Sequence, residues 1–219
     1  MRQADATHWL LSDGTEVEIL NLIDDHSRLV LASVSFPTIK AADVVQTSHE
    51  AAQAYGFPAA WLSDNAAVFS GESRRGKVII ETELENLGIR CIHSTPYHPQ
   101  TCGKVERFHQ TLKRFLIKQA AHATLAHLQL QLDAFRTYYN QQRPHRALAG
   151  QMPLTAFNAH LKAKPCSWSY THGGARQATG LSHPMFEQLQ REDMAVERER
   201  LRTLEDPRSA ERLSFRERV

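Results

Sequence analysis

Apolar residues in the first part of the chain follow the spacing of β-strands. Residues 16–24 and 28–36 are two runs rich in Ile, Leu and Val, a composition typical of strands. The polar tripeptide Asp25-His26-Ser27 separates them by the length of a hairpin turn. Residues 1–9 are less regular, and we expect them to form an edge strand or a first strand that leads into the hairpin.

The middle of the chain alternates between helical and strand-like patterns. Helices are predicted over residues 41–55 and 78–87, each followed by a glycine that acts as a stop signal. Short strands are predicted over 59–63 and 89–94, and two longer helices over 103–119 and 125–141, with Pro144 ending the second. This order of elements predicts an α/β domain in which helices flank a mixed sheet.

The pattern changes after residue 161. Residues 163–184 are rich in Gly, Ser and Pro, with little periodicity, which is typical of a linker. From Glu187 onward, nine acidic residues alternate with eight arginines. Such a mixture favours an exposed helix with many ion pairs, or a disordered tail. We therefore predict a core over residues 1–160, a linker over 161–186 and a charged tail over 187–219.

Composition narrows the class of protein only slightly. Hydrophobic residues make up 42% of the 219 positions, which is ordinary for a globular protein. No apolar run approaches the length of about 18 residues that a membrane span needs. The three cysteines, at positions 91, 102 and 166, are widely spaced and form no C-x-x-C pair. Neither a disulfide framework nor a cysteine zinc site is indicated, and a reducing cytoplasm fits.

Positive charge is concentrated in one stretch, although the formal net charge of the chain is only +2. Residues 104–146 hold eight basic side chains and two acidic ones, Glu106 and Asp133. Such a concentration is expected of a surface that binds phosphates. A solvated helix face is an equally good explanation from charge alone.

Glu106 falls in the first turns of the helix predicted from residue 103. The apolar positions Val105, Phe108, Leu112, Phe115 and Leu116 recur every three or four residues and are expected to face the core. Glu106, His109, Gln110 and Lys113 share a different face, which we expect to point outward. A single carboxylate of this kind is more often a surface residue than a ligand. The run of sequence around Glu106 shifts the comparison in favour of a ligand.

That run resembles a motif of the integrase catalytic core, shared by retroviral integrases and many insertion-sequence transposases. Residues 96–106 (PYHPQTCGKVE) are similar to its P-Y-[HN]-P-Q-x-x-G-x-x-E pattern. Four further segments resemble family sequences in the same order along the chain. They are QADAT at 3–7 followed by IDDHSR at 23–28, LSDNAAVF at 62–69 and YNQQRPHRAL at 139–148.

The resemblance implies a ribonuclease-H-like fold with a mixed five-stranded sheet, and three metal-binding catalytic carboxylates. Asp5 would lie on the first strand, Asp64 after the fourth and Glu106 on a late helix. Carboxylates suit hard cations, and we expect two Mg²⁺ ions, with Mn²⁺ as a substitute. Asp5 would bridge both ions, while Asp64 and Glu106 would each hold one. The implied reaction is DNA cleavage followed by strand transfer.

DNA is the implied partner, bound by a homo-oligomer. Lys104, Arg107 and Lys113 are expected to contact phosphates, an interaction that is sensitive to salt and largely independent of sequence. The remaining expected DNA-binding residues are His98, Gln100 and Arg143. For His98, a hydrogen bond that stabilises its loop explains the residue equally well. The bacterial nucleoid is the expected location.

Several alternatives stay open at this point. Ala66 stands where the family usually has glycine, a change that matters if the position needs positive φ. The residues before Asp5 are too few for the usual end-recognition region, so a truncated, inactive remnant that binds DNA or full-length transposase is the main alternative. A cellular ribonuclease-H-type nuclease is less favoured because of the R-P-H segment. Asp24 and Asp25 could form a metal pair, although a hairpin turn explains them more simply.

Overall fold

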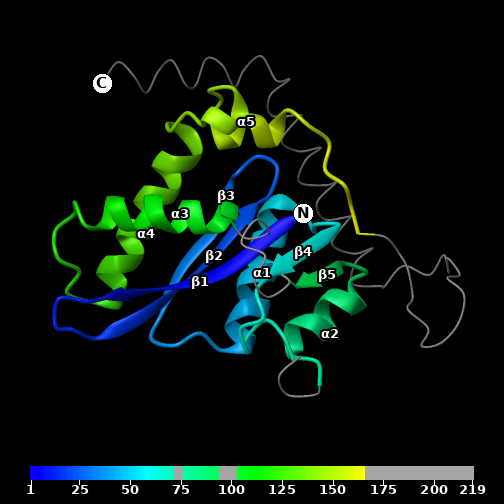
Figure 1. Cartoon of the computed structure of the whole chain (residues 1–219), viewed down its shortest axis with the longest axis horizontal. Coiled ribbons are helices and arrows are strands. Elements are labelled where there is room, and N and C mark those ends of the chain that lie inside the picture. The colour runs from blue at the N-terminus through cyan, green and yellow to red at the C-terminus, as the bar shows by residue number, and fades with distance from the viewer. Residues whose placement is uncertain (72–75, 94–102, 166–219) are drawn as a thin grey trace, which may run out of the picture. The chain divides into compact units, whose positions relative to one another are not determined.

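A computed structural model describes residues 1–71, 76–93 and 103–165 of the chain (Figure 1). Its strands are β1 (Arg2–Leu10), β2 (Glu16–Asp24), β3 (Val30–Phe36), β4 (Ala60–Ser63) and β5 (Arg90–His93). Its helices are α1 (Ala41–Tyr55), α2 (Ile79–Asn86), α3 (Gly103–Leu116), α4 (Leu125–Gln141) and α5 (Pro153–Asn158). The predicted order of strands and helices is confirmed, and α1, α4 and β2 have the predicted bounds.

The five strands form one mixed sheet in the order β3-β2-β1-β4-β5. The β1–β2 and β2–β3 pairs are antiparallel, while β4 runs parallel to both β1 and β5. In Figure 1, β1 lies in the centre of the sheet between β2 and β4. It was expected to be an edge strand or a first strand that leads into the hairpin; it does precede the hairpin in the chain, and it lies in a central position of the sheet. Its pairing with β4 depends on a segment some 60 residues away in sequence, which no local pattern reveals.

Both faces of the sheet are covered, which explains the almost unbroken burial of β2. Leu20 and Leu22 belong to a core cluster that includes residues of α1 and α2. Ile19 and Ile23 point to the opposite face, where they join a second cluster with α3 and α4. Asp5 pairs with Asn21, which alternates with Ile19 and Ile23 along β2. Asp5 therefore lies on the side of the sheet that α3 covers.

The apolar face predicted for α3 is confirmed. Val105, Phe108, Leu112 and Leu116 are buried in the second cluster, and Phe115 packs against it. The helix ends at Leu116 rather than at the predicted Gln119. Two short elements were not predicted from the sequence: a 3₁₀ turn over Arg146–Leu148 and helix α5, which begins at Pro153.

Two further observations concern the rest of the chain. None of the helices within the described ranges combines the length and apolarity needed to cross a membrane. The predicted tail over residues 187–219 and most of the predicted linker over 161–186 lie outside the described residues. The proposed division of the chain into core, linker and tail stays a prediction.

Candidate active site

Asp5 and Asp64 come from neighbouring parallel strands. The register of β1 with β4 pairs Ala4 with Ser63, and the next residue on each strand is one of the two aspartates. Asp64 follows β4 directly, at its carboxyl end. In open α/β sheets, ligands bind at the carboxyl ends of parallel strands, so this is a favourable place for a functional site.

Glu106 approaches the same region from α3. It lies in the first turn of that helix and is exposed. His109, one turn further along the helix, places its Nδ1 atom 3.7 Å from Oδ2 of Asp5. Residues three apart in a helix share a face, so the side of α3 that carries Glu106 is turned toward Asp5.

The electrostatics of Asp5 show that the three carboxylates influence one another. Burial raises the pKa of Asp5 from 3.8 to about 7, and the negative charges of Asp64 and Glu106 add to this increase. A hydrogen bond of 2.8 Å from the backbone N–H of Ala6 opposes it. Three carboxylates from distant positions therefore share one electrostatic environment, in which an additional negative charge is unfavourable.

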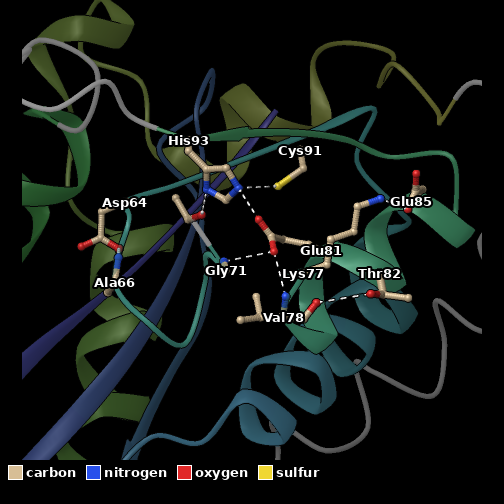
Figure 2. A network of polar contacts seen from close by, with 11 residues as sticks. Asp64, Ala66, Gly71, Lys77, Val78, Glu81, Thr82, Glu85, Cys91 and His93 are labelled. Atoms are coloured by element: carbon tan, nitrogen blue, oxygen red, sulfur yellow. Dashed lines mark hydrogen bonds and ion pairs between the residues drawn. The ribbon is translucent and has the colours of Figure 1, made fainter. Parts of the chain in front are cut away.

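The carboxylates of Asp5, Asp64 and Glu106 do not converge on a shared position. Within residues 1–71, 76–93 and 103–165, no three His, Cys, Asp or Glu side chains are close enough to hold a metal ion jointly. Asp64 instead accepts a 3.0 Å hydrogen bond from the backbone N–H of Ala66 (Figure 2). The chemistry of the set nevertheless fits a divalent cation, since oxygen ligands suit Mg²⁺ and its charge would offset their repulsion.

His109 is a site residue that the sequence analysis placed wrongly. It was expected on an outward face, but only 12% of its side chain is exposed. Burial, with a smaller effect of Lys113, lowers the pKa of His109 to about 4, so the ring is neutral near pH 7. The 3.7 Å approach to Asp5 is therefore not an ion pair, and it is longer than a hydrogen bond. His109 lies three residues after Glu106 in the same helix, and this spacing is the sequence signal that could have identified it as a site residue.

The expected DNA-binding residues have different surroundings. Arg107 is exposed on α3, and Lys113 is half-buried on the same helix. Lys104 is bound by the carboxylate of Asp25, with Nζ 2.7 Å from each oxygen. Arg143 contacts Nε2 of His145 at 3.0 Å and lies over the ring of Tyr139. His98 and Gln100 lie outside the described residues.

The turn residues beside the site resolve two open points. Asp24 accepts hydrogen bonds from the N–H and the hydroxyl of Ser27, which confirms its role in the hairpin turn. Among the described residues other than glycine, only Arg28 and Ala149 have positive φ. Ala66 therefore adopts an ordinary conformation, and the absent glycine causes no backbone strain there. The turn after Asp64 is closed by the Asp64 carboxylate, whereas Oδ1 of Asn65 is buried with no hydrogen-bond partner.

A polar network next to Asp64 was not predicted from the sequence. Figure 2 shows Glu81 of α2 at its centre. One carboxylate oxygen lies 2.9 Å from Nε2 of His93, and the other accepts hydrogen bonds from the N–H groups of Gly71 and Val78. The other ring nitrogen of His93 lies 3.4 Å from the hydroxyl of Ser63. The network thereby joins β4, β5 and α2 to the segment that follows Asp64.

Comparison with known proteins agrees with this architecture. A family model described as an integrase core domain matches residues 87–153, a range that includes Glu106. The catalytic core of BIV integrase superposes with a TM-score of 0.52 at 26% identity, over 72% of this chain and 93% of that one. The chain thus resembles an integrase core in sequence over residues 87–153 and in its fold. Its fold is the predicted ribonuclease-H-like one, which the HTLV-2 integrase core in complex with magnesium also shares (TM-score 0.54, 16% identity, 71% of this chain and 94% of that one).

Two further proteins match this chain in sequence. An insertion element IS407 protein of 31.7 kDa from Burkholderia multivorans is 26% identical over 138 residues, 63% of this chain and 48% of that protein. A Pol-related polyprotein of the mouse intracisternal A-particle is 32% identical over 118 residues, 53% of this chain and 13% of the polyprotein. The chain thus spans about half the length of the first of these relatives and a small part of the second.

Proposed function

We propose that this chain is the catalytic core of a DNA transposase, which cleaves phosphodiester bonds and transfers strands in a reaction that depends on divalent metal ions. The observation that carries the proposal is the coupling of Asp5 to Asp64 and Glu106. Burial raises the pKa of the Asp5 carboxyl, and the charges of Asp64 and Glu106, which come from two other parts of an integrase-type fold, raise it further. Perturbed carboxylates of this kind are typical of functional sites.

Asp5, Asp64 and Glu106 are the residues that would hold the two proposed ions, Mg²⁺ or Mn²⁺. Bound divalent ions would activate the attacking oxygen and stabilise the leaving oxygen. The solved HTLV-2 core of the same fold is in complex with magnesium, which supports the choice of metal. A positive counter-charge would also favour the ionised form of Asp5, whose pKa is otherwise about 7.

The chain's own residues would position the DNA. Arg107 is the best placed for phosphates because its side chain is exposed on the helix that carries Glu106. Lys113 extends this basic surface two turns further along α3. Lys104 would also contact phosphates, although Asp25 partly neutralises its charge. His98, Gln100 and Arg143 complete the proposed DNA-binding set. Such phosphate contacts hold the substrate without reading its sequence.

Nicking of supercoiled DNA tests the proposal directly. We expect the purified chain to nick DNA in the presence of Mn²⁺ or Mg²⁺, and Asp64→Asn to abolish this activity. Asp133→Asn is a matched control, because Asp133 forms an exposed ion pair with Arg136 on α4. Nicking that survives Asp64→Asn would contradict the assignment. DNA binding with no nicking by the wild-type chain would support the inactive, DNA-binding alternative.

Strand transfer and assembly need a separate measurement. Glu106→Gln keeps the size of the side chain and removes its charge, so we expect it to eliminate joining of a pre-cleaved DNA end while the protein stays folded. Light scattering of the protein with and without DNA tests the proposed homo-oligomer. Solved HTLV-2 cores in dimeric and trimeric forms support that part of the proposal.

A further inference from the structure

The carboxylate of Asp25 binds side chains from two other elements. Nζ of Lys104, on α3, lies 2.7 Å from both carboxylate oxygens. Nε2 of Gln3, on β1, donates a hydrogen bond of 2.6 Å to Oδ1. Asp25 itself follows β2, in the turn before β3. One side chain thus connects the hairpin to β1 and α3.

Both partners of Asp25 stand two residues from a proposed metal-binding carboxylate. Gln3 and Asp5 point to the same side of β1, because side chains alternate along a strand. Lys104 and Glu106 lie together in the first turn of α3. The position of Asp25 is therefore mechanically linked to the spacing between Asp5 and Glu106.

The turn that carries Asp25 is well supported. Its backbone N–H donates to the carbonyl of Met1 at 2.9 Å, and its own carbonyl accepts from Arg28. Asp24 closes the same turn through Ser27. Only 19% of the Asp25 side chain is exposed, so solvent screens its interaction with Lys104 less than it screens a pair on the open surface.

We infer that Asp25 is a positioning residue, which holds the first turn of α3 against β1 through Lys104 and so sets the distance between Glu106 and Asp5. This inference rests on the proposed function for its catalytic consequence. The link between Asp25 and α3 stands on the contacts alone. A hairpin carboxylate that served only the turn would need neither Lys104 nor Gln3.

Asp25→Asn is the primary test, since it preserves the shape of the side chain and removes its charge. We expect the rate constant for nicking at saturating DNA to fall by about 10- to 100-fold, because small displacements of catalytic groups have effects of this size. The Kd for DNA should not rise, because Lys104, Arg107 and Lys113 all keep their positive charges. Asp133→Asn, which breaks the exposed pair on α4, should change neither quantity.

Two readouts separate positioning from general stabilisation. Hydrogen–deuterium exchange should become faster in residues 107–110 of Asp25→Asn, whose N–H groups donate to the carbonyls of the first turn, while the rest of α3 keeps its protection. At saturating DNA, where a weaker phosphate contact of Lys104 does not limit the rate, Lys104→Gln should lower the rate constant for nicking about as much as Asp25→Asn does. Adding Asp25→Asn to Lys104→Gln should then cause little further loss, since both substitutions break the same contact.

The outcomes distinguish the inference from the proposed function. Wild-type nicking in Asp25→Asn, or losses that multiply fully in the double variant, would overturn the inference and leave the function intact. A wild-type chain that never nicks DNA would defeat the proposed function. In that case, unchanged exchange in residues 107–110 of Asp25→Asn would still overturn the link to α3, and faster exchange would support it. If Asp25→Asn fails to fold, Lys104→Gln carries the same test, through its exchange and its rate constant at saturating DNA.

Discussion

Asn21 donates a hydrogen bond from its side-chain amide to Nε2 of His109, across 3.1 Å between β2 and α3. The direction follows from the other contacts of Asn21, whose Oδ1 accepts from Ser33 and whose Nδ2 also lies within reach of the carbonyl of Ile19. An amide nitrogen can only donate, so Nε2 of His109 must accept. The ring proton of neutral His109 is then on Nδ1, the atom that faces Asp5.

The tautomer and charge of His109 are therefore the first prediction. Nitrogen-detected NMR of the metal-free protein should show a neutral ring protonated at Nδ1 from pH 6 to 8, because burial lowers its pKa to about 4. Disappearance of the signal in His109→Gln would assign it. A ring that gains a proton near pH 6.5, the ordinary histidine value, would contradict the arrangement.

Removal of the Asp5 charge should stabilise the metal-free protein. The folded-state pKa of Asp5 is raised to about 7, so the fold binds this proton more tightly than the unfolded chain does. Wild-type stability should accordingly fall as pH rises from about 4 to about 7, and Asp5→Asn should not show this fall. The gain at pH 8 should be on the order of 2 to 4 kcal/mol at most.

Urea denaturation at pH 5 and pH 8 measures this difference. Asp133→Asn serves as the control, because its carboxylate is about half exposed and pairs with Arg136 on the surface. Equal stabilities of wild type and Asp5→Asn at both pH values would show that Asp5 is not held in an unfavourable environment. The same substitution is expected to abolish nicking, so stability and activity should change in opposite directions.

The basic face of α3 should bind DNA through phosphates. Arg107→Ala and Lys113→Ala are each expected to weaken binding about equally for unrelated sequences and to reduce the slope of log K against log salt by about 1. Lys77→Ala is the control, since Lys77 pairs with Glu85 beside α2. A slope that is unchanged in the α3 variants would place the phosphate contacts elsewhere.

Glu81 should be important for stability although it carries no proposed chemistry. Glu81→Ala removes the acceptor for Gly71, Val78 and His93 together, and we expect a loss of about 2 to 3 kcal/mol. Glu85→Ala, on the same helix, breaks only the exposed pair with Lys77 and should cost less than about 1 kcal/mol. Thermal or urea unfolding of both variants measures the contrast, and equal losses would argue against the network.

The secondary structure was predictable because its signals are local. The hairpin strands, α1 and α4 follow from the period of apolar residues and from stop signals within short windows. The buried face of α3 follows from the same periodicity. The fold class was also predictable from the sequence, because family-like motifs at 3–28, 62–69, 96–106 and 139–148 occur in the expected order.

The surroundings of the candidate site depended on tertiary packing. The central place of β1, the inward position of His109 and the capture of Lys104 by Asp25 all join residues far apart in sequence. Periodicity shows that α3 has a buried face, but not which strand lies beneath each of its other positions. Which strand lies beneath a given position of α3 depends on the strand order, in which the β2–β3 hairpin and β4 lie on either side of β1. The sequence alone therefore determined the helices, strands and candidate carboxylates, and only the packed fold determined which charges meet and which are neutralised.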